Sequence, residues 1–287
     1  MEQKIKTALI QYEIQPSWSE NMDRVEALLR TAKSRGARLA VLPEFFNMPY
    51  DMSLVPELAE DAPGGRTCAR LAQWARDLEI VLVGGTIAEK EGGRFFNTAT
   101  VWDRDGRLLA KRRKVHLFDV DLPGGVSFRE SAVLSPGDEI AVVEVLGIKL
   151  GVAVCYDIRF PETFRLLALQ GADFAALPGA FNHVSGPAHW EILLRCRAME
   201  NTFYTAGVSG LSPVGSNYHA WGHSMMVDPF GEVTVNLGRA EGLGLAEIDP
   251  ARIREVRDRL PFLRQRRQDL YRLELLGDRE RLRHADR

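Results

Sequence analysis

Short apolar runs alternate with segments of helical periodicity along almost the whole chain. Apolar runs of strand length occur at residues 4–12, 39–42 and 148–154, and helical patterns separate several such runs. Other neighbouring runs are joined by short turns, as at residues 103–106, which is typical of hairpins. Hairpin strands are antiparallel, whereas parallel strands need a long crossover connection. The alternation therefore predicts mixed sheets in an α/β or α+β fold.

The same pattern gives the expected elements. The expected strands span residues 4–12, 39–42, 80–86, 97–102, 108–117, 140–145, 148–154, 173–177, 203–208, 224–227, 232–236 and 243–248. The expected helices are one that ends at Gly36 and others at residues 67–77, 161–170, 188–200 and 250–259. No linker of biased composition interrupts the 287 residues, so we expect one domain over residues 1–287.

Charge and composition narrow the classes of partner. The formal net charge of −2 gives no overall attraction to nucleic acid or to an anionic membrane. We find neither a signal peptide nor an apolar span of about 18 residues. Cys68, Cys155 and Cys196 show neither a disulfide framework nor zinc-ligand spacing, and no glycine-rich phosphate loop occurs. We therefore expect a cytoplasmic protein that binds a small molecule and needs no metal and no cofactor.

Cys155 is the first candidate for chemistry. It follows the apolar run at residues 147–154 and precedes a helical segment that starts near Pro161. A thiol at such a turn is expected to be exposed at the edge of the sheet, where helix N–H groups lower its pKa. A buried structural cysteine is the alternative.

Two polar segments are candidates to act with this thiol. Glu44 follows an apolar run and Pro43, beside two phenylalanines that can desolvate it and raise its pKa towards that of a general base. Lys114 belongs to the basic run at residues 111–114, where strand alternation would place it on the same side as His116. Taken singly, either segment also fits a solvated surface.

Together these segments resemble the carbon–nitrogen hydrolase (nitrilase) superfamily, whose catalytic residues are Glu, Lys and Cys in that chain order. The resemblance runs from Ile5 to about Tyr271 and includes the segments at residues 128–131, 135–138, 178–182, 185–191, 220–224 and 228–231. It implies an α+β fold, a four-layer α-β-β-α sandwich. It also implies that Glu44, Lys114 and Cys155 are catalytic and that Glu130 is a second glutamate near the lysine.

The resemblance implies hydrolysis of a linear amide through a Cys thioester. Phe118, Tyr156, Phe181 and Asn182 are expected to line the substrate pocket because they neighbour the catalytic segments. Arg159 either pairs with Glu162 or binds the substrate. A Cys-His site is the rival within nucleophilic enzymes, but it leaves the Glu44 and Lys114 segments unexplained.

Within the superfamily, the segments at residues 115–124 and 178–182 are most similar to the omega-amidase branch, which hydrolyses amides such as alpha-ketoglutaramate. The alternatives are deaminated glutathione amidase and, from another class, a non-catalytic binding or scaffold member. The resemblance also implies a homodimer, formed by the helix after Cys155 and the helix at residues 188–200. The C-terminal helix and tail at residues 251–287 are expected at the subunit interface.

Overall fold

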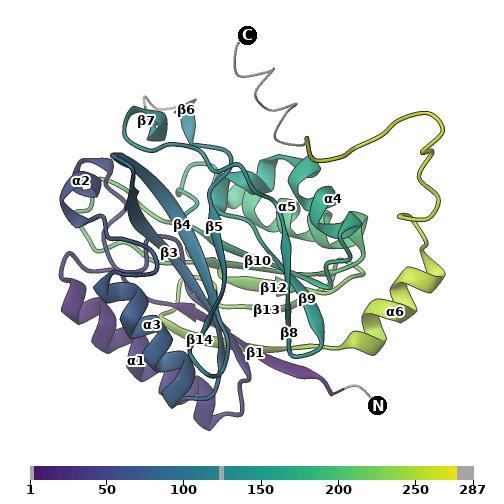
Figure 1. Ribbon diagram of the computed structural model, residues 1–287, viewed down its shortest axis with the longest axis horizontal. Helices are drawn as coiled ribbons and strands as arrows, with labels where there is room; N and C mark the ends of the chain where they lie inside the picture. The colour runs from purple at the N-terminus through teal and green to yellow at the C-terminus, as the bar shows by residue number, and fades with distance from the viewer. Residues whose placement is uncertain (1–2, 123–125, 277–287) are drawn as a thin grey trace.

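Two six-stranded sheets form the centre of the protein in a computed structural model that describes residues 3–122 and 126–276 (Figure 1). The first sheet has the spatial order β14 (Gly242–Ile248), β1 (Ile5–Gln11), β2 (Leu39–Val41), β3 (Val81–Glu91), β4 (Arg94–Trp102) and β5 (Leu108–Arg113). The second has the order β13 (Val233–Asn236), β12 (Met225–Val227), β11 (Tyr204–Ser209), β10 (Phe174–Gly179), β9 (Ile148–Val152) and β8 (Val142–Val145).

Both sheets are mixed. In the first sheet, β1 is antiparallel to β14 and parallel to β2. In the second sheet, β10 is parallel to both β9 and β11, and β11 is antiparallel to β12. The helical crossovers and hairpins in the sequence pattern therefore predicted the sheet type correctly.

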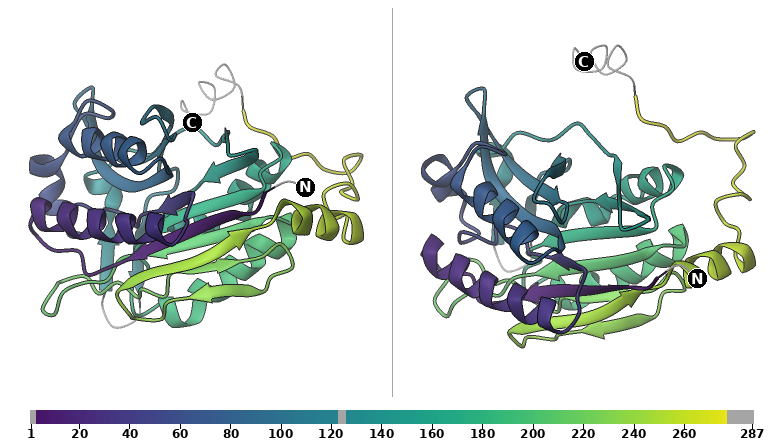
Figure 2. Two further views of the ribbon diagram at one scale, coloured as in Figure 1. Left: turned by 90° about the horizontal axis from the view of Figure 1, so that it is seen from below. Right: turned by 60° about the horizontal axis from the view of Figure 1, so that its bottom comes forward.

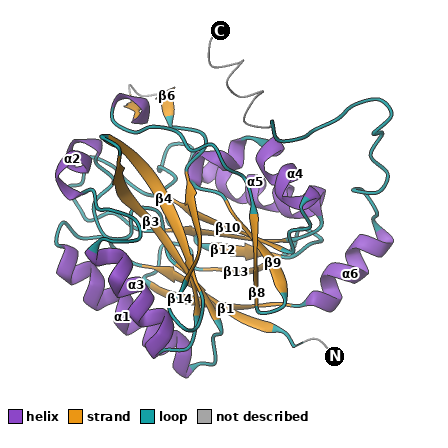
Figure 3. Cartoon of the chain, in the orientation of Figure 1, coloured by secondary structure: helices purple, strands orange, loops and turns teal. Residues whose placement is uncertain are grey.

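Helices cover the outer face of each sheet (Figures 2 and 3). α1 (Trp18–Ser34) and α3 (Arg66–Asp77) pack on the first sheet through buried residues such as Met22, Leu29 and Trp74. α4 (Pro161–Leu169) and α5 (Gly186–Asn201) pack on the second sheet through residues such as Leu167 and Trp190. These layers confirm the predicted α-β-β-α sandwich. Two further helices, α2 (Val55–Leu58) and α6 (Pro250–Arg259), lie outside these layers.

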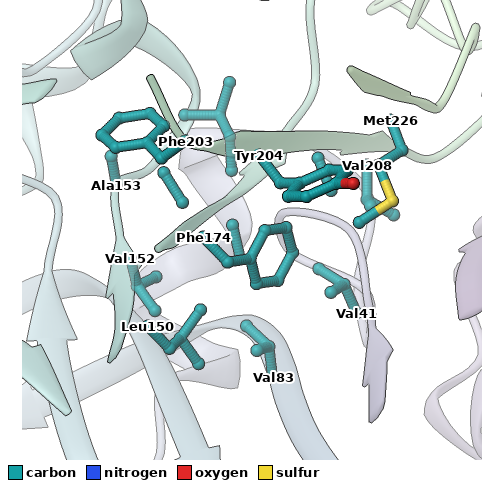
Figure 4. Close-up of a cluster of buried hydrophobic side chains, with 14 of the residues drawn as sticks. Val41, Val83, Leu150, Val152, Ala153, Phe174, Phe203, Tyr204, Val208 and Met226 are labelled. Atoms are coloured by element: carbon teal, nitrogen blue, oxygen red, sulfur yellow. The ribbon is translucent and has the colours of Figure 1, made fainter. Parts of the chain in front are cut away.

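The inner core lies between the two sheets (Figure 4). Val41 and Val83 of the first sheet and Leu150, Phe174 and Val208 of the second belong to one cluster of buried side chains, and all five are fully buried. Burying each side chain of this size contributes about 1.5–3 kcal/mol, so the contact between the sheets supplies a large part of the folding free energy.

Three features differ from the sequence prediction. β5 ends at Arg113, so Lys114 lies just beyond the strand that was expected to contain it, and β9 ends at Val152, so two residues separate Cys155 from the strand it was expected to follow directly. A hairpin of β6 (Asp119–Leu122) and β7 (Val126–Arg129) was missed. Each strand does alternate polar and apolar residues, but only over four residues, the shortest run in which alternation indicates a strand.

The chain after α6 runs away from the sandwich through residues 260–276 (Figure 1). Residues 277–287, the end of the segment expected at a subunit interface, lie outside the described residues. Within residues 3–122 and 126–276, no helix combines the length and apolar character needed to cross a membrane.

Candidate active site

The loop after β2 carries Glu44 into the interior, where it is 1% exposed. Its two neighbours are fixed by Thr86 of β3: the Thr86 N–H donates to the Pro43 carbonyl at 3.2 Å, and the Phe45 N–H donates to Thr86 Oγ1 at 2.8 Å. The first sheet therefore holds the backbone of this loop on both sides of Glu44.

Lys114 follows β5, and its side chain is fully buried. Its N–H donates to the Asn97 carbonyl of β4 at 2.8 Å, so the backbone continues the ladder for one residue. Nζ lies 3.0 Å from Glu44 Oε1 and 2.9 Å from the Glu130 carboxylate. An ammonium without water needs such partners, and two carboxylates supply them.

Glu130 opens a short 3-10 helix (Glu130–Ala132) that follows β7, and it is fully buried. Besides Lys114, two donors reach its carboxylate: the Tyr50 hydroxyl at 2.5 Å and the Phe118 N–H at 2.7 Å. These bonds fix the carboxylate that in turn orients the ammonium.

The two oxygens of Glu44 have different surroundings. Oε1 accepts hydrogen bonds from Lys114 and, at 2.7 Å, from the Asn97 amide. Oε2 is buried and has no nitrogen or oxygen partner among the described residues. The Glu44 carboxylate and the Cys155 thiol are close enough that each affects the pKa of the other. Oε2 is therefore the oxygen available to a thiol proton.

Cys155 begins a 3-10 helix (Cys155–Arg159) with φ at +43°, in the left-handed region that non-glycine residues rarely adopt. Asp157 stabilises this turn by accepting the Val154 N–H at 2.9 Å and the His116 N–H at 2.9 Å. Strained backbone of this kind costs about 1–3 kcal/mol and is concentrated at functional sites.

The expectation of an exposed thiol with a lowered pKa is wrong for this structure. Cys155 is only 5% exposed, and burial together with the nearby Glu44 charge raises the pKa of its thiol well above the ordinary value. The backbone donor to Sγ is the N–H of Ala180, at 3.5 Å, which directly follows the neighbouring strand β10. The thiol therefore needs a base beside it.

Electrostatics favour Glu44 as that base. Burial raises the pKa of Glu44, the Lys114 ammonium opposes this rise, and the Glu130 charge adds to it. For Lys114, burial alone would lower the pKa, but the charges of Glu130 and Glu44 hold it well above its ordinary value. The lysine thus stays an ammonium while the carboxylate moves towards neutrality, which suits a fixed cation beside a proton acceptor.

A small cavity, called the catalytic pocket below, opens at Cys155. Its volume is about 10 Å³, and the residues that line it include Cys155 and all five predicted substrate-binding residues, Phe118, Tyr156, Arg159, Phe181 and Asn182. Glu44, Lys114 and Glu130 lie behind the thiol in the buried cluster. The structure therefore brings all nine predicted site residues to one place.

Arg159 makes contacts other than the predicted local pair with Glu162. Its Nη1 lies 3.1 Å from His189 Nδ1, and its guanidinium lies over the rings of Tyr156 and Phe181. These contacts hold the cation against the wall of the catalytic pocket.

The histidines do not form a Cys-His site. His116 Nδ1 lies 2.8 Å from Asp157 Oδ1, and its ring stacks on Phe160. His189 contacts Arg159, and His223 stacks on Trp221. Within the described chain, none of them hydrogen-bonds Sγ of Cys155, and no group of three His, Cys, Asp or Glu residues is arranged to hold a metal ion.

Sequence reasoning missed three side chains of this site: Tyr50, Asn97 and Tyr218. Asn97 is fully buried on a strand that is otherwise apolar or threonine-rich, and a buried amide on such a strand was the available signal. Tyr50 and Tyr218 lie in loops, where hydrophobic periodicity gives no information about which side chains turn inward.

Comparisons with known proteins agree with this geometry. Residues 6–258 match the profile of the family described as Carbon-nitrogen hydrolase. Omega-amidase NIT2 of Xenopus tropicalis is 45% identical over 271 residues, which cover 94% of this chain and 98% of that protein. Omega-amidase NIT2 of Homo sapiens is 42% identical over 270 residues, covering 94% and 98%.

A solved structure shows the same fold. Saccharomyces cerevisiae Nit3, a member of branch 10 of the nitrilase superfamily, superposes with a TM-score of 0.85 at 37% identity. The match covers 92% of this chain and 97% of that one.

Proposed function

The chain belongs to the carbon–nitrogen hydrolase family, and from this premise we propose that it hydrolyses a short amide with a carboxylate at its far end. It is an amidase, and the similarity of nearly the whole chain to proteins named omega-amidase supports an omega-amidase type of reaction. Alpha-ketoglutaramate is the representative substrate. The products are ammonia and a dicarboxylate.

The observation that carries the proposal is the buried cluster of Glu44, Lys114 and Glu130 against Cys155. Removing an ammonium and two carboxylates from water costs several kcal/mol per ion before pairing offsets it. Buried charges with perturbed pKa values that converge on a thiol are typical of covalent catalysis.

In the first half of the reaction, Glu44 Oε2 takes the proton of the Cys155 thiol while Sγ attacks the amide carbon. The negative charge moves to the carbonyl oxygen. The Lys114 ammonium and the Tyr156 N–H hold that oxygen, and such donors are most effective in a site without water. The C–N bond then breaks, and Glu44 returns its proton to the leaving nitrogen, so ammonia departs and a thioester remains.

In the second half, Glu44 takes a proton from water, and the resulting hydroxide attacks the thioester carbon. The C–S bond breaks, Glu44 returns its proton to Sγ, and the acid is released. Lys114 stays charged throughout because the two carboxylates raise its pKa. The net reaction consumes one water for each amide.

Two groups are proposed to hold the substrate's far carboxylate in the catalytic pocket. Arg159 supplies a cation there. Asn182 Oδ1 accepts the N–H groups of Val184 and Ser185, at 3.0 and 2.8 Å, which turns its Nδ2 away from them. That Nδ2 is buried without a partner among the described residues, so its hydrogen atoms remain for a ligand.

The central test is ammonia release by Cys155→Ala, which should lose activity and keep the wild-type circular dichroism. Cys196→Ala, a matched change at a partly exposed cysteine of α5, should keep activity. Appreciable turnover by the Cys155 variant would exclude the thioester route. A wild-type protein that releases no ammonia from any short amide would be a non-catalytic member.

Substrate choice is tested on Arg159→Met. Losing a charged hydrogen bond costs about 1.5–3 kcal/mol, so kcat/KM for alpha-ketoglutaramate should fall about 10- to 100-fold. A neutral amide of equal length should lose little. Equal losses on both substrates would show that Arg159 is not the carboxylate anchor. Strong wild-type preference for deaminated glutathione would place the chain in that branch.

We also propose a cytoplasmic homodimer formed through α4 and α5. Ile192 and Met199 of α5 and nearby Phe230 are exposed and line one surface groove, which is more apolar surface than a monomer needs there. Residues 251–287 are proposed to cross to the partner subunit, and the described part of this segment runs away from the sandwich after α6 (Figure 2).

A further inference from the structure

Two separate cavities meet behind the nucleophile. The catalytic pocket at Cys155 has a volume of about 10 Å³. A second cavity, called the side chamber below, has a volume of about 380 Å³, and Glu44 is among the residues that line it. Ala180 and Tyr218 line both. The proposed thiol and its proposed base are neighbours, yet they face different cavities.

Tyr218 is the aromatic side chain that lines both cavities among the residues the structure describes. Its ring centroid lies 4.5 Å from that of Tyr50 and 5.3 Å from that of Phe128, and its hydroxyl donates to the Ala180 carbonyl. The adjoining backbone is also fixed, because the His183 N–H donates to the His219 carbonyl at 3.0 Å. The aromatic ring is therefore held in place from several sides.

The two cavities differ in size and chemistry. The catalytic pocket is much the smaller of the two, whereas the side chamber, at about 380 Å³, is within the range of small-ligand sites, about 300–1,000 Å³. The side chamber is largely apolar, with Ile14, Met48 and Leu54 in its wall. The described residues that line it include Glu44 and Asp51 but neither Arg nor Lys, so a carboxylate is disfavoured there.

We propose that Tyr218 is a specificity-determining residue, which limits the acyl part of the substrate by closing the catalytic pocket against the side chamber. The inference rests on the proposed amidase function and deepens it. With the ring in place, the acyl group is confined to the side lined by Arg159 and Asn182, which favours a chain that ends in a carboxylate. Without the ring, the two cavities join, and the combined space accepts a neutral aliphatic chain of about six carbons.

The experiment compares hexanamide with propanamide, two neutral amides that differ in chain length. Tyr218→Ala should raise the ratio of kcat/KM for hexanamide to that for propanamide about tenfold or more, since each accommodated methylene contributes strongly to discrimination. Tyr218→Phe keeps the ring and loses only the bond to Ala180, so it should keep the wild-type ratio. Leu109→Ala, on β5 away from both cavities, is the matched truncation control.

Alkylation of Cys155 gives a second readout that needs no turnover. Peptide mapping measures the labelling rates by iodoacetamide and by N-hexyl iodoacetamide. Tyr218→Ala should speed labelling by the hexyl reagent relative to the small one. This result would support the role of the Tyr218 ring in closing the catalytic pocket even if the wild-type protein hydrolysed no amide. Failure of the proposed function is therefore distinguishable from failure of this inference.

An unchanged hexanamide ratio and an unchanged labelling ratio in Tyr218→Ala would overturn the proposal. A Tyr218→Phe variant as permissive as Tyr218→Ala would overturn it as well, because the hydroxyl rather than the ring would then set the limit. If Tyr218→Ala lacks a cooperative unfolding transition, Tyr218→Val, which also removes the ring, is used for both measurements, and the same outcomes decide.

Discussion

Replacing Glu130 tests how the buried cluster divides its work between stability and chemistry. Its carboxylate accepts hydrogen bonds from Lys114, Tyr50 and Phe118 at 2.9, 2.5 and 2.7 Å. Glu130→Leu removes the carboxylate that accepts all three bonds, and it leaves a buried hydroxyl, a buried N–H and an ammonium with a single carboxylate. Glu130→Gln keeps the size and one oxygen acceptor but removes the charge.

The expected magnitudes follow from that count. Removing one partner of a buried ion pair costs about 3–5 kcal/mol, so Glu130→Leu should lower the free energy of unfolding by that amount. Glu130→Gln should cost about 1–3 kcal/mol, because one or two donors lose a good acceptor. The matched control is Glu91→Gln, whose carboxylate pairs with Arg113 and Lys111 at the surface, and it should change stability much less.

Glu130→Gln should also shift the pH dependence of kcat/KM in a defined direction. The Glu130 charge raises the pKa of Glu44, so removing it lowers that pKa. Glu44 acts as a base only when ionised, and activity therefore appears as pH rises through its pKa. For Glu130→Gln, the acid limb of kcat/KM should move to lower pH, while the plateau falls because a less basic carboxylate accepts the thiol proton less readily.

Urea unfolding at pH 7 and ammonia release from pH 4 to 9 measure the two effects. Stability of Glu130→Leu equal to that of Glu91→Gln would refute the burial argument. An acid limb of Glu130→Gln that moves to higher pH would refute the assignment of Glu44 as the base.

Three further outcomes are expected. Lys114→Met should lower kcat by about 100- to 1,000-fold in steady-state assays, because the oxyanion loses its cation; wild-type kcat would contradict this. Glu89 is buried, and although burial alone would raise its pKa, bonds from Arg113, Lys111 and Thr98 hold it at about 2, against an ordinary 4.5. Glu89→Gln should therefore cost about 3 kcal/mol at pH 7, a difference that shrinks as pH falls from about 4.5 to 2 in urea titrations. Light scattering at micromolar concentration should give twice the chain mass of 32.1 kDa, and Ile192→Asp should reduce it to the single mass; a monomeric wild type would refute the interface.

The layers of the fold were predictable because burial imposes a period on the sequence. α6 was expected at residues 250–259, and its bounds agree, since Pro250 suits the first turn and Asp249 caps it. The ends of β5 and β9 were not predictable from apolarity. In sequence, Lys114 continues the alternating pattern of β5, and Val154 continues the apolar run of β9. In the structure, both residues lie beyond the ends of these strands.

The sequence predicted part of the candidate site but not its electrostatics. Motifs identified Glu44, Lys114 and Cys155, because family motifs preserve the order of residue types along a chain. They gave no information about Asn97, whose amide donates to Oε1 of Glu44 while Oε2 stays without a partner among the described residues. They also gave none about the burial that raises the pKa of Cys155. Both depend on side chains that converge from distant loops and strands, which no local pattern encodes.

The free energy needed to bury the charges of Glu44, Lys114 and Glu130 is itself informative about their role. A buried ion pair is commonly no more stabilising than apolar side chains of the same volume, so stability does not explain an ammonium held by Glu44 and Glu130 inside a sandwich core. The proposed chemistry explains it, because a fixed cation facing a thiol stabilises a developing oxyanion most strongly where water is absent. The strained turn at Cys155 leads to the same conclusion: the two β-sheets supply the stability that keeps both unfavourable features in place.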